Sequence, residues 1–522
     1  NIRADAPVKV GPASETVTVE ADAVVVDTVS PTLKAVVDER RIEELPLNGR
    51  NATQLMRLIV GTVTDLRADT TSGTTYPGVT PVSVNGGRSN TTNFMLDGSQ
   101  NNDHYTNVPN PMPNPDALQE FSVQTNSFSA EVGRQSGRIV NAVTKSGTNE
   151  LHGSAFWFLR NKAMNSTPYF GAVGPDGKRA DDGLKRNQYG TTVGGPVFIP
   201  KFYDGRNKTF FFFSWQGTVQ RQTPPDVGKV VPTAAQRAGD FSNLSKALKN
   251  PAGGTFANNR IPTSQFSPIS QEILKYIPLP TSGNTITTSA ANNYDDDQFL
   301  VRIDHQITQN NRLTGRYWDS YAVTPAILNP SNYLEQTTGR TWLNRSINLT
   351  DTHTFGASVM NQFMFAFTRM DGHNAPLLPA ASIASFGSNL YNDNQPQWHV
   401  TVAGYFGTLN TGDTNIFLRD EYTFTDTVRV TTGRHSFAFG GEVGRGIGDV
   451  RNNFRANGQW NFNGSAPFTG DSLAAFMIGR FNTLVQGIGE YRDTRFDRYA
   501  LFAQDEWKTT RNFTLSLGLR WE

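Results

Sequence analysis

The sequence predicts a mainly β protein, in which a transmembrane antiparallel β-barrel follows a small mixed α/β N-terminal domain. Glycine (47 residues) and aromatic side chains (11%) are abundant among the 522 residues, as is typical of β structure. From residue 151 onward, eleven segments of roughly ten residues or more alternate apolar and polar side chains, which suits tilted membrane strands. The connections between these segments alternate between short and long, as in outer-membrane barrels.

Composition excludes several other classes of protein. The formal net charge is +1, so the chain lacks the basic footprint of a nucleic-acid-binding protein. Cysteine is absent, which excludes disulfides, thiolate metal sites and a cysteine nucleophile. No run of about 18 apolar residues occurs, so no transmembrane helix is expected. Neither His-Glu-x-x-His nor Gly-x-Ser-x-Gly is present. We therefore predict no enzymatic activity, no catalytic residue, no metal site and no cofactor.

Residues 1–30 are predicted to be an extended N-terminal segment. They are rich in β-branched side chains and show no helical period. Two interpretations stay open for this segment. It is either the last strand of an upstream domain or an exposed strand that pairs with a partner by β-augmentation.

Residues 31–149 are predicted to form the small mixed domain. Residues 37–45 have helical spacing with Asp38 as the N-cap, and residues 52–59 are predicted to form a second short helix. A polar hairpin over residues 82–98 and strands over 118–125 and 137–145 follow. The apolar content is modest, so this domain needs a larger host around it.

Residues 150–522 are predicted to form a partial barrel of about eleven strands. In the clearest pair, residues 299–307 and 312–321, apolar side chains such as Ile303 alternate with polar ones such as Arg302 and Asp304. Short turns are expected near residues 201–206, 308–311, 356–358, 431–434 and 509–512, and long connections over 161–186, 221–296, 322–341, 371–415 and 446–490. An odd strand number is unusual for a bacterial barrel, so we expect a C-terminally truncated half of a 22-stranded barrel. A soluble β-solenoid or sandwich is the alternative.

Short motifs recur in a fixed order along the whole chain. In the first domain these are Leu45-Pro-Leu-Asn-Gly-Arg-Asn51, Val84-Asn-Gly-Gly-Arg88, Phe94-Met-Leu-Asp-Gly98, Leu118-Gln-Glu-Phe121, Gly137-Arg-Ile-Val-Asn141 and Thr144-Lys-Ser-Gly-Thr148. In the barrel they include Arg186-Asn-Gln-Tyr-Gly190, Lys208-Thr-Phe-Phe-Phe-Phe213, Val301-Arg-Ile-Asp-His305 and Tyr499-Ala-Leu-Phe-Ala-Gln-Asp-Glu-Trp507. In this order the motifs resemble those of TonB-dependent outer-membrane receptors of the Oar-like group, whose upstream carboxypeptidase regulatory-like domain is missing here.

The resemblance implies an energy-coupled importer in the outer membrane of a Gram-negative-type bacterium. Residues 31–149 would be the plug domain that occludes the barrel. The inner-membrane TonB complex would pull on an N-terminal box by means of the proton-motive force and admit a large or scarce extracellular ligand. The expected partners are TonB, outer-membrane lipid and that unknown ligand, with no nucleic acid. The candidate TonB box consists of Glu15, Thr16, Val17, Thr18 and Val19, and residues 22–28 are a similar candidate.

Two groups of side chains are the candidate site residues. The plug motif consists of Asn85, Gly86, Gly87, Arg88, Leu96, Asp97, Gly98, Glu120 and Gly137, and Asp97-Gly98 is interpreted as a turn. The candidate latch pairs plug arginines with barrel carboxylates; its members are Arg88, Arg134, Arg138, Asp304, Glu421, Glu442 and Glu506. The alternative interpretation is that these charges are solvated in the lumen and that each contributes little to stability.

A hypothesis of a different class is a surface adhesin or interaction protein. It would use the long extracellular connections over residues 221–296 and 371–415. Loss of attachment on loop deletion, with no dependence on energy coupling, would support it.

Overall fold

The computed structural model describes residues 33–64, 76, 79, 82–84, 86–126, 129–133, 138–167, 169, 177–179, 181–223, 227–377, 381–390, 396–464 and 468–522. The candidate box at residues 15–19, its alternative at 22–28, and Asn85, Arg134 and Gly137 lie outside these described residues. No helix in the described part of the chain is long and apolar enough to cross a membrane.

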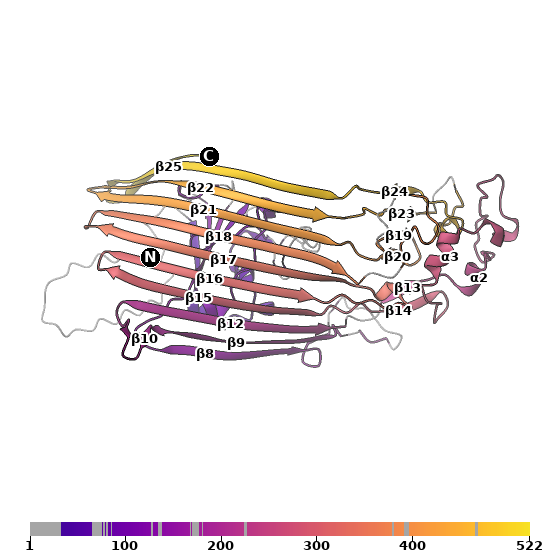
Figure 1. Ribbon diagram of the computed structural model, residues 1–522, viewed down its shortest axis with the longest axis horizontal. Helices are drawn as coiled ribbons and strands as arrows, with labels where there is room; N and C mark the ends of the chain where they lie inside the picture. Colours follow the sequence, from indigo (N-terminus) through magenta and orange to yellow (C-terminus); the bar gives the residue numbers. More distant parts are fainter. Residues whose placement is uncertain are drawn as a thin grey trace.

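An eleven-stranded antiparallel sheet, here called the strand wall, makes up most of the structure (Figure 1). Each strand pairs with its neighbours in chain order. The strands are β8 (His152–Asn161), β9 (Leu184–Pro196), β12 (Thr209–Gln222), β15 (Tyr294–Thr308), β16 (Asn311–Thr324), β17 (Thr338–Phe355), β18 (Val359–Pro376), β21 (Asn415–Thr432), β22 (His435–Asn452), β25 (Glu490–Thr510) and β26 (Phe513–Trp521). This sheet confirms the predicted fold class.

The connections of the strand wall are sorted by length, as predicted. Two residues join β15 to β16, β21 to β22 and β25 to β26, and three join β17 to β18. The connection between β9 and β12 lies at the same end of the strands but is longer, and it contains the small strand pair β10 (Phe198–Ile199) and β11 (Tyr203–Asp204). Figure 1 shows the short turns at one end of the strands and the long connections at the other.

Side chains alternate across the strand wall between a buried inner face and an exposed outer face. On β15, Leu300 and Asp304 are 1% and 2% exposed, whereas Phe299 and Ile303 are 39% and 46% exposed. The polar residues predicted to share one face therefore lie inside, and the apolar ones point outward, as a membrane strand requires. The inner face is not uniformly polar, because Phe212, Leu300 and Trp318 are also buried there.

The described residues between 33 and 144 form a compact inner unit around a five-stranded sheet in the order β1-β6-β7-β4-β5. Its strands are β1 (Leu33–Asp38), β4 (Thr92–Leu96), β5 (Ser99–Gln100), β6 (Leu118–Asn126) and β7 (Arg138–Thr144). In Figure 1 this unit is the indigo and purple segment against the middle of the strands. Its hydrophobic core includes Phe94, Leu96 and Phe121 and is continuous with Phe212, Leu300 and Trp318 of the strand wall.

The helices of the inner unit agree with the sequence pattern. Helix α1 (Glu39–Glu44) begins after Asp38, whose carboxylate accepts the N–H of Arg41 at 2.9 Å, so the N-cap prediction is confirmed. Residues 52–58 form the 3-10 helix η2 (Ala52–Leu58), capped by Asn51. Their buried side chains, including Leu55 and Met56, explain why the pattern resembled an amphipathic α-helix.

The predicted hairpin over residues 82–98 is wrong in its pairing. Strand β3 (Val82–Val84) pairs with β2 (Thr62–Thr64), while β4 pairs in parallel with β7. The 3-10 turn η3 (Ser89–Thr91) separates β3 from β4, and β4 is buried at four of its five positions. A strand buried in this way is stabilised by a neighbour in a central sheet more than by an exposed hairpin partner. The Asp97-Gly98 turn is confirmed by the β4–β5 pairing.

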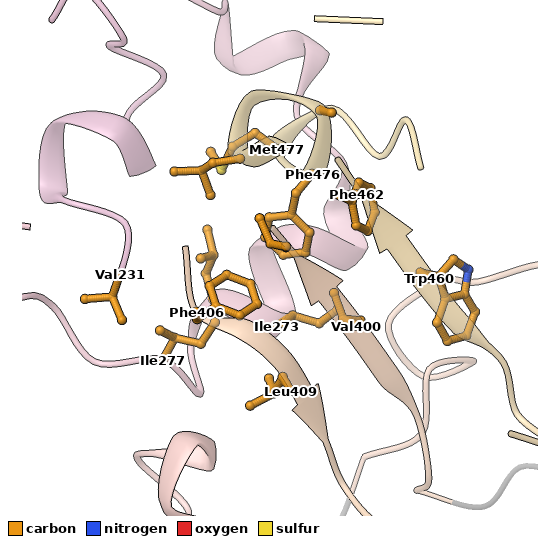
Figure 2. Close-up of a cluster of buried hydrophobic side chains, with 14 of the residues drawn as sticks. Val231, Ile273, Ile277, Val400, Phe406, Leu409, Trp460, Phe462, Phe476 and Met477 are labelled. Atoms are coloured by element: carbon orange, nitrogen blue, oxygen red, sulfur yellow. The ribbon is translucent and has the colours of Figure 1, made fainter. Parts of the chain in front are cut away.

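The long connections pack together into a cap with its own hydrophobic core. It contains the helices α2 (Ala234–Arg237), α3 (Pro268–Leu274) and α4 (Ser472–Met477), the pair β13 (Val227–Val230) and β14 (Thr285–Thr288), and a sheet of β19 (His399–Val402), β20 (Gly407–Asn410), β23 (Gln459–Phe462) and β24 (Thr483–Val485). In Figure 2, Phe406, Phe462 and Phe476 converge from different elements. The sequence-based view of these connections as simply polar is therefore incomplete.

Candidate functional site

Asp97 joins the inner unit to the strand wall. It lies in the β4–β5 turn with a φ of 51°, a left-handed conformation that short polar side chains tolerate better than most. Its Oδ1 accepts the backbone N–H of Thr144 at 2.8 Å. The guanidinium Nε of Arg316 on β16 lies 2.8 Å from its Oδ2, and that arginine side chain is 1% exposed. Arg302 Nη1 on β15 is 3.7 Å from Oδ1. Asp97 thus balances buried positive charge on the wall.

The charges around Asp97 form one network across the interface. Arg302 donates through Nη1 to the carbonyl oxygen of Thr144 at 2.8 Å and through Nε to Asp304 at 2.9 Å. Arg312 donates to the same Asp304 carboxylate at 2.6 Å. Asp304 therefore holds the wall arginines in place, and one of them reaches across to the inner unit. Charge-assisted hydrogen bonds of this kind are stronger than neutral ones.

Two further pairs have the same polarity, with the acid on the inner unit and the arginine on the wall. Arg419 Nη1 donates to Asp103 Oδ2 at 2.8 Å, and these side chains are only 1% and 2% exposed. Arg429 lies 2.6 Å from Glu131, and Arg520 Nη1 donates to the Glu131 carbonyl oxygen at 2.9 Å. The inner unit is therefore held at β15–β16, at β21 and at β26.

This arrangement is the reverse of the predicted latch, in which arginines of the inner unit would pair with carboxylates of the wall. Among the described residues, Arg88 is exposed and makes no ion pair, and Arg138 lies against Gly87 within the inner unit. Glu421 and Glu442 are paired with Arg498 on the wall, at 3.0 and 2.7 Å.

The remaining predicted wall carboxylates also lack an inner-unit arginine as partner. Asp304 is paired with wall arginines, as described above, and Glu506 stands opposite Ser436 and Ser516 in the sheet register. The latch prediction is wrong for Asp304, Glu421 and Glu442, because arginines of the wall already neutralise these acids, and Glu506 has no inner-unit arginine as partner among the described residues. An acid directly after a buried strand, as in Phe94-Met-Leu-Asp97, is the sequence signal that was missed.

The other described plug-motif residues have structural positions. Leu96 is fully buried in the inner-unit core. Gly86 and Gly98 adopt left-handed φ values of 75° and 78°, which glycine accommodates without strain. The Arg138 guanidinium occupies the place where a Cβ on Gly87 would lie, so that position has no room for a side chain. Glu120 stands opposite Asp38 in the β1–β6 register.

A second contact region surrounds the turn at residues 47–51. Asn48 Oδ1 accepts hydrogen bonds from Arg160 at 2.7 Å and from Arg186 at 3.1 Å, on β8 and β9. The carbonyl oxygen of Gly49 accepts from Gln188 at 3.0 Å. Arg50 pairs with Asp116, donates to Gln216 on β12 at 3.2 Å, and packs on Phe156 and Phe158. Burial lowers the pKa of Arg50 to about 10.

Cavities lie on both sides of these contacts. One of about 580 Å³ is bounded by the turn at residues 47–51, by the start of η2, and by the long-connection ends of the wall strands, including Tyr294 and Thr338. Another of about 590 Å³ contains Asp97 and Arg316 in its lining, together with residues at the short-turn ends such as Asn310. The inner unit therefore separates two polar spaces that face opposite ends of the strands.

The chain matches known proteins at two levels. The family model described as an outer membrane beta barrel domain matches residues 143–522. The TonB-dependent transporter Oar of Myxococcus xanthus is 28% identical over 191 residues, which is 34% of this chain and 17% of that protein.

Solved structures of similar fold include the outer membrane transporter YddB of Escherichia coli (TM-score 0.52, 13% identity), which matches over 93% of this chain and 56% of its own. The ferric enterobactin receptor PfeA of Pseudomonas aeruginosa (TM-score 0.52, 12% identity) matches over 94% of this chain and 57% of its own. The siderophore receptor PirA of Acinetobacter baumannii (TM-score 0.51, 14% identity) matches over 94% of this chain and 56% of its own. The chain thus spans little more than half the length of these structures. At these identities the likeness shows the fold alone.

Proposed function

The chain belongs to the outer membrane β-barrel family and resides in the outer membrane, and from this premise we propose that it is a TonB-dependent transporter. It carries a large or scarce ligand into the periplasm, with energy relayed from the proton-motive force by the TonB complex. The short turns of the strand wall face the periplasm and the cap faces the outside. The relatives named above are transporters or siderophore receptors, which favours import over adhesion.

The observation that carries this proposal is an inner unit held against the wall by buried acid–arginine pairs, with a polar cavity at each side. In the proposed organisation, residues 31–149 are the plug and residues 150–522 are the partial barrel. A contact made of charge pairs can be broken and re-formed, since both partners are readily solvated when they separate. Separating such a pair lets water replace the lost contact, so a mechanical pull on the N-terminus can break the pairs one after another.

Residues 15–19 are the proposed attachment point for TonB. An extended segment of β-branched residues can add a strand to a partner sheet through backbone hydrogen bonds. The segment precedes β1, the first strand of the inner unit. A pull on it therefore reaches the sheet that carries Asp97.

Deletion of residues 15–19 is expected to abolish binding of the protein to the purified periplasmic domain of TonB. Deletion of residues 22–28 is the matched control, and it should leave binding intact. Isothermal titration calorimetry measures both variants. If the two deletions gave equal losses of TonB binding, or none, the coupling segment would lie elsewhere. Ligand uptake that survives a protonophore would contradict the transport function itself.

A further inference from the structure

We infer that the 580 Å³ cavity between the inner unit and strands β9, β12, β15 and β17 binds an acidic oligosaccharide. A carboxylate of the sugar is held by Arg186, with Arg160 beside it. This inference rests on the proposed function, since it names the ligand class of the importer. The cavity volume lies within the range of about 300–1,000 Å³ that is usual for small-ligand sites.

The cavity lining suits hydroxyl groups. Side-chain amides are its commonest polar group, and they include Asn51, Gln54, Gln188, Gln216, Gln220 and Gln298. An amide can both donate and accept hydrogen bonds, and so can a sugar hydroxyl group.

Buried polar atoms of the lining that lack a hydrogen-bond partner among the described residues include one donor and one acceptor. These two are the indole Nε1 of Trp342, a donor, and Oε1 of Gln298, an acceptor. Orphaned polar atoms of this kind are rare in native structures and call for an explanation. Both atoms lie just beneath the cavity surface, so a ligand hydroxyl group can bind them only after the lining side chains shift.

Aromatic rings form part of the same lining. Tyr76 and Trp342 lie with ring centroids 6.5 Å apart and planes tilted by 51°, and Tyr294 is close by in the lining. Rings with one polar atom present an apolar face together with a hydrogen-bonding edge. Tyr76 and Trp342 are themselves 2% and 3% exposed, so they form a firm wall beneath the cavity, and the Tyr76 hydroxyl already donates to Asp296.

The charge in the lining favours an anion. Arg186 of the lining donates to Gln220 at 2.9 Å and to Asn48 at 3.1 Å; Arg160, which lies outside this lining, donates to the same Asn48 oxygen. Both arginines thus have neutral partners, and among the described residues neither lies within ion-pair distance of a carboxylate.

The carboxylate found in the described lining does not neutralise these arginines. It belongs to Asp296, which accepts hydrogen bonds from Tyr76, Ser320 and Gln298. A planar guanidinium binds a carboxylate with two parallel hydrogen bonds, which an amide oxygen cannot match. An acid group on the ligand is therefore the preferred partner of Arg186.

The ligand acid would also act on the inner unit. Asn48 belongs to the turn at residues 47–51, and its contacts with Arg160 and Arg186 join that turn to β8 and β9. A carboxylate that takes over either arginine removes one of these contacts. Ligand binding thus weakens the hold of the wall on the inner unit at the end that faces the cap.

The test is a titration of the purified protein in detergent with tri-galacturonic acid, followed by tryptophan fluorescence and calorimetry. Neutral maltotriose and the acidic peptide tri-glutamate are the comparison ligands. We expect saturable binding of tri-galacturonate and at least tenfold weaker binding of the other two. Arg186→Gln should weaken tri-galacturonate binding by about 30-fold or more, as loss of one partner of a desolvated charge pair does.

The matched control is Arg221→Gln, which removes a β12 arginine that pairs with Asp295 at half-exposed positions. It should leave the affinity unchanged, and Trp342→Phe should cause a smaller loss than Arg186→Gln. Retained heat-modifiable gel mobility shows that each variant is folded.

Three results would overturn the inference: equal affinity for maltotriose, tighter binding of tri-glutamate, or no binding of tri-galacturonate at all. The titration uses neither TonB nor a proton gradient. Its failure is therefore distinguishable from failure of the transport proposal.

Discussion

The Asp97→Asn variant is expected to release the inner unit from the strand wall at a much lower urea concentration than the parent protein. Asparagine tolerates the left-handed backbone at this position, so the substitution removes the charge with little backbone strain. It leaves the buried guanidinium of Arg316 without its counter-ion. Uncompensated charge of this kind costs about 3–5 kcal/mol.

Hydrogen exchange of β4, β6 and β7, followed by mass spectrometry across a urea series, measures this release. With a denaturant slope of about 1–3 kcal/mol per molar urea, the midpoint should fall by more than about 1 M. Asp204→Asn is the control, because Asp204 pairs with Arg206 in the exposed β10–β11 hairpin. It should leave the midpoint unchanged. Equal exchange in Asp97→Asn and the parent would show that Asp97 does not hold the inner unit.

The Trp398→Ala variant is expected to unfold the cap while the strand wall stays intact. Trp398 is fully buried. Its ring lies 6.1 Å from that of Tyr333, in the connection between β16 and β17, and 6.0 Å from that of Phe386, in its own connection between β18 and β21. Truncation of a core tryptophan costs about 3–5 kcal/mol. The wall strands keep their own backbone pairing, so this loss falls on the cap.

Limited proteolysis with fragment identification measures cap unfolding, and heat-modifiable gel mobility reports on the wall. Rapid cleavage within residues 227–288 and 396–410 is expected at conditions where the parent resists. Ile488→Ala is the matched control, since Ile488 lies in a cap connection but is 94% exposed; such surface substitutions change stability by less than about 0.5 kcal/mol. Loss of wall strands together with the cap would contradict separate folding of the two regions.

Much of the strand wall could be predicted because a membrane strand carries its own local signal. Ile303 and Asp304 are adjacent in sequence and lie on opposite faces, 46% and 2% exposed. This alternation, together with turns such as that at residues 309–310, requires no knowledge of the rest of the fold.

The latch and the cap could not be predicted in the same way, because both depend on contacts between distant segments. The inward orientation of Arg302 and its pairing with Asp304 on the same strand follow from alternation, but its contacts with residues 97 and 144 depend on how deep the inner unit sits. The cap core combines Val231, Tyr333, Trp398 and Phe476 from four different connections. Its helices have four to seven residues, too few for a helical period to emerge.

The inner unit is placed on the inner face of the strand wall, and a disulfide between Ala130→Cys and Gly518→Cys tests this placement most directly. A Cβ at Gly518 would lie 3.0 Å from that of Ala130, and a small shift brings the pair to the usual disulfide distance of about 3.8 Å. The chain has no native cysteine, so no other disulfide can form within one molecule. Leu519→Cys replaces Gly518→Cys in the control, because Leu519 is 77% exposed on the outer face.

A protease site introduced at residues 146–150, between β7 and β8, separates the inner unit from the wall after cleavage. We predict that the oxidised Ala130→Cys/Gly518→Cys fragments stay joined on a denaturing gel and separate on reduction, whereas the Leu519→Cys control separates throughout. Separation of the oxidised Gly518→Cys fragments without reductant, or equal joining in the control, would contradict the account.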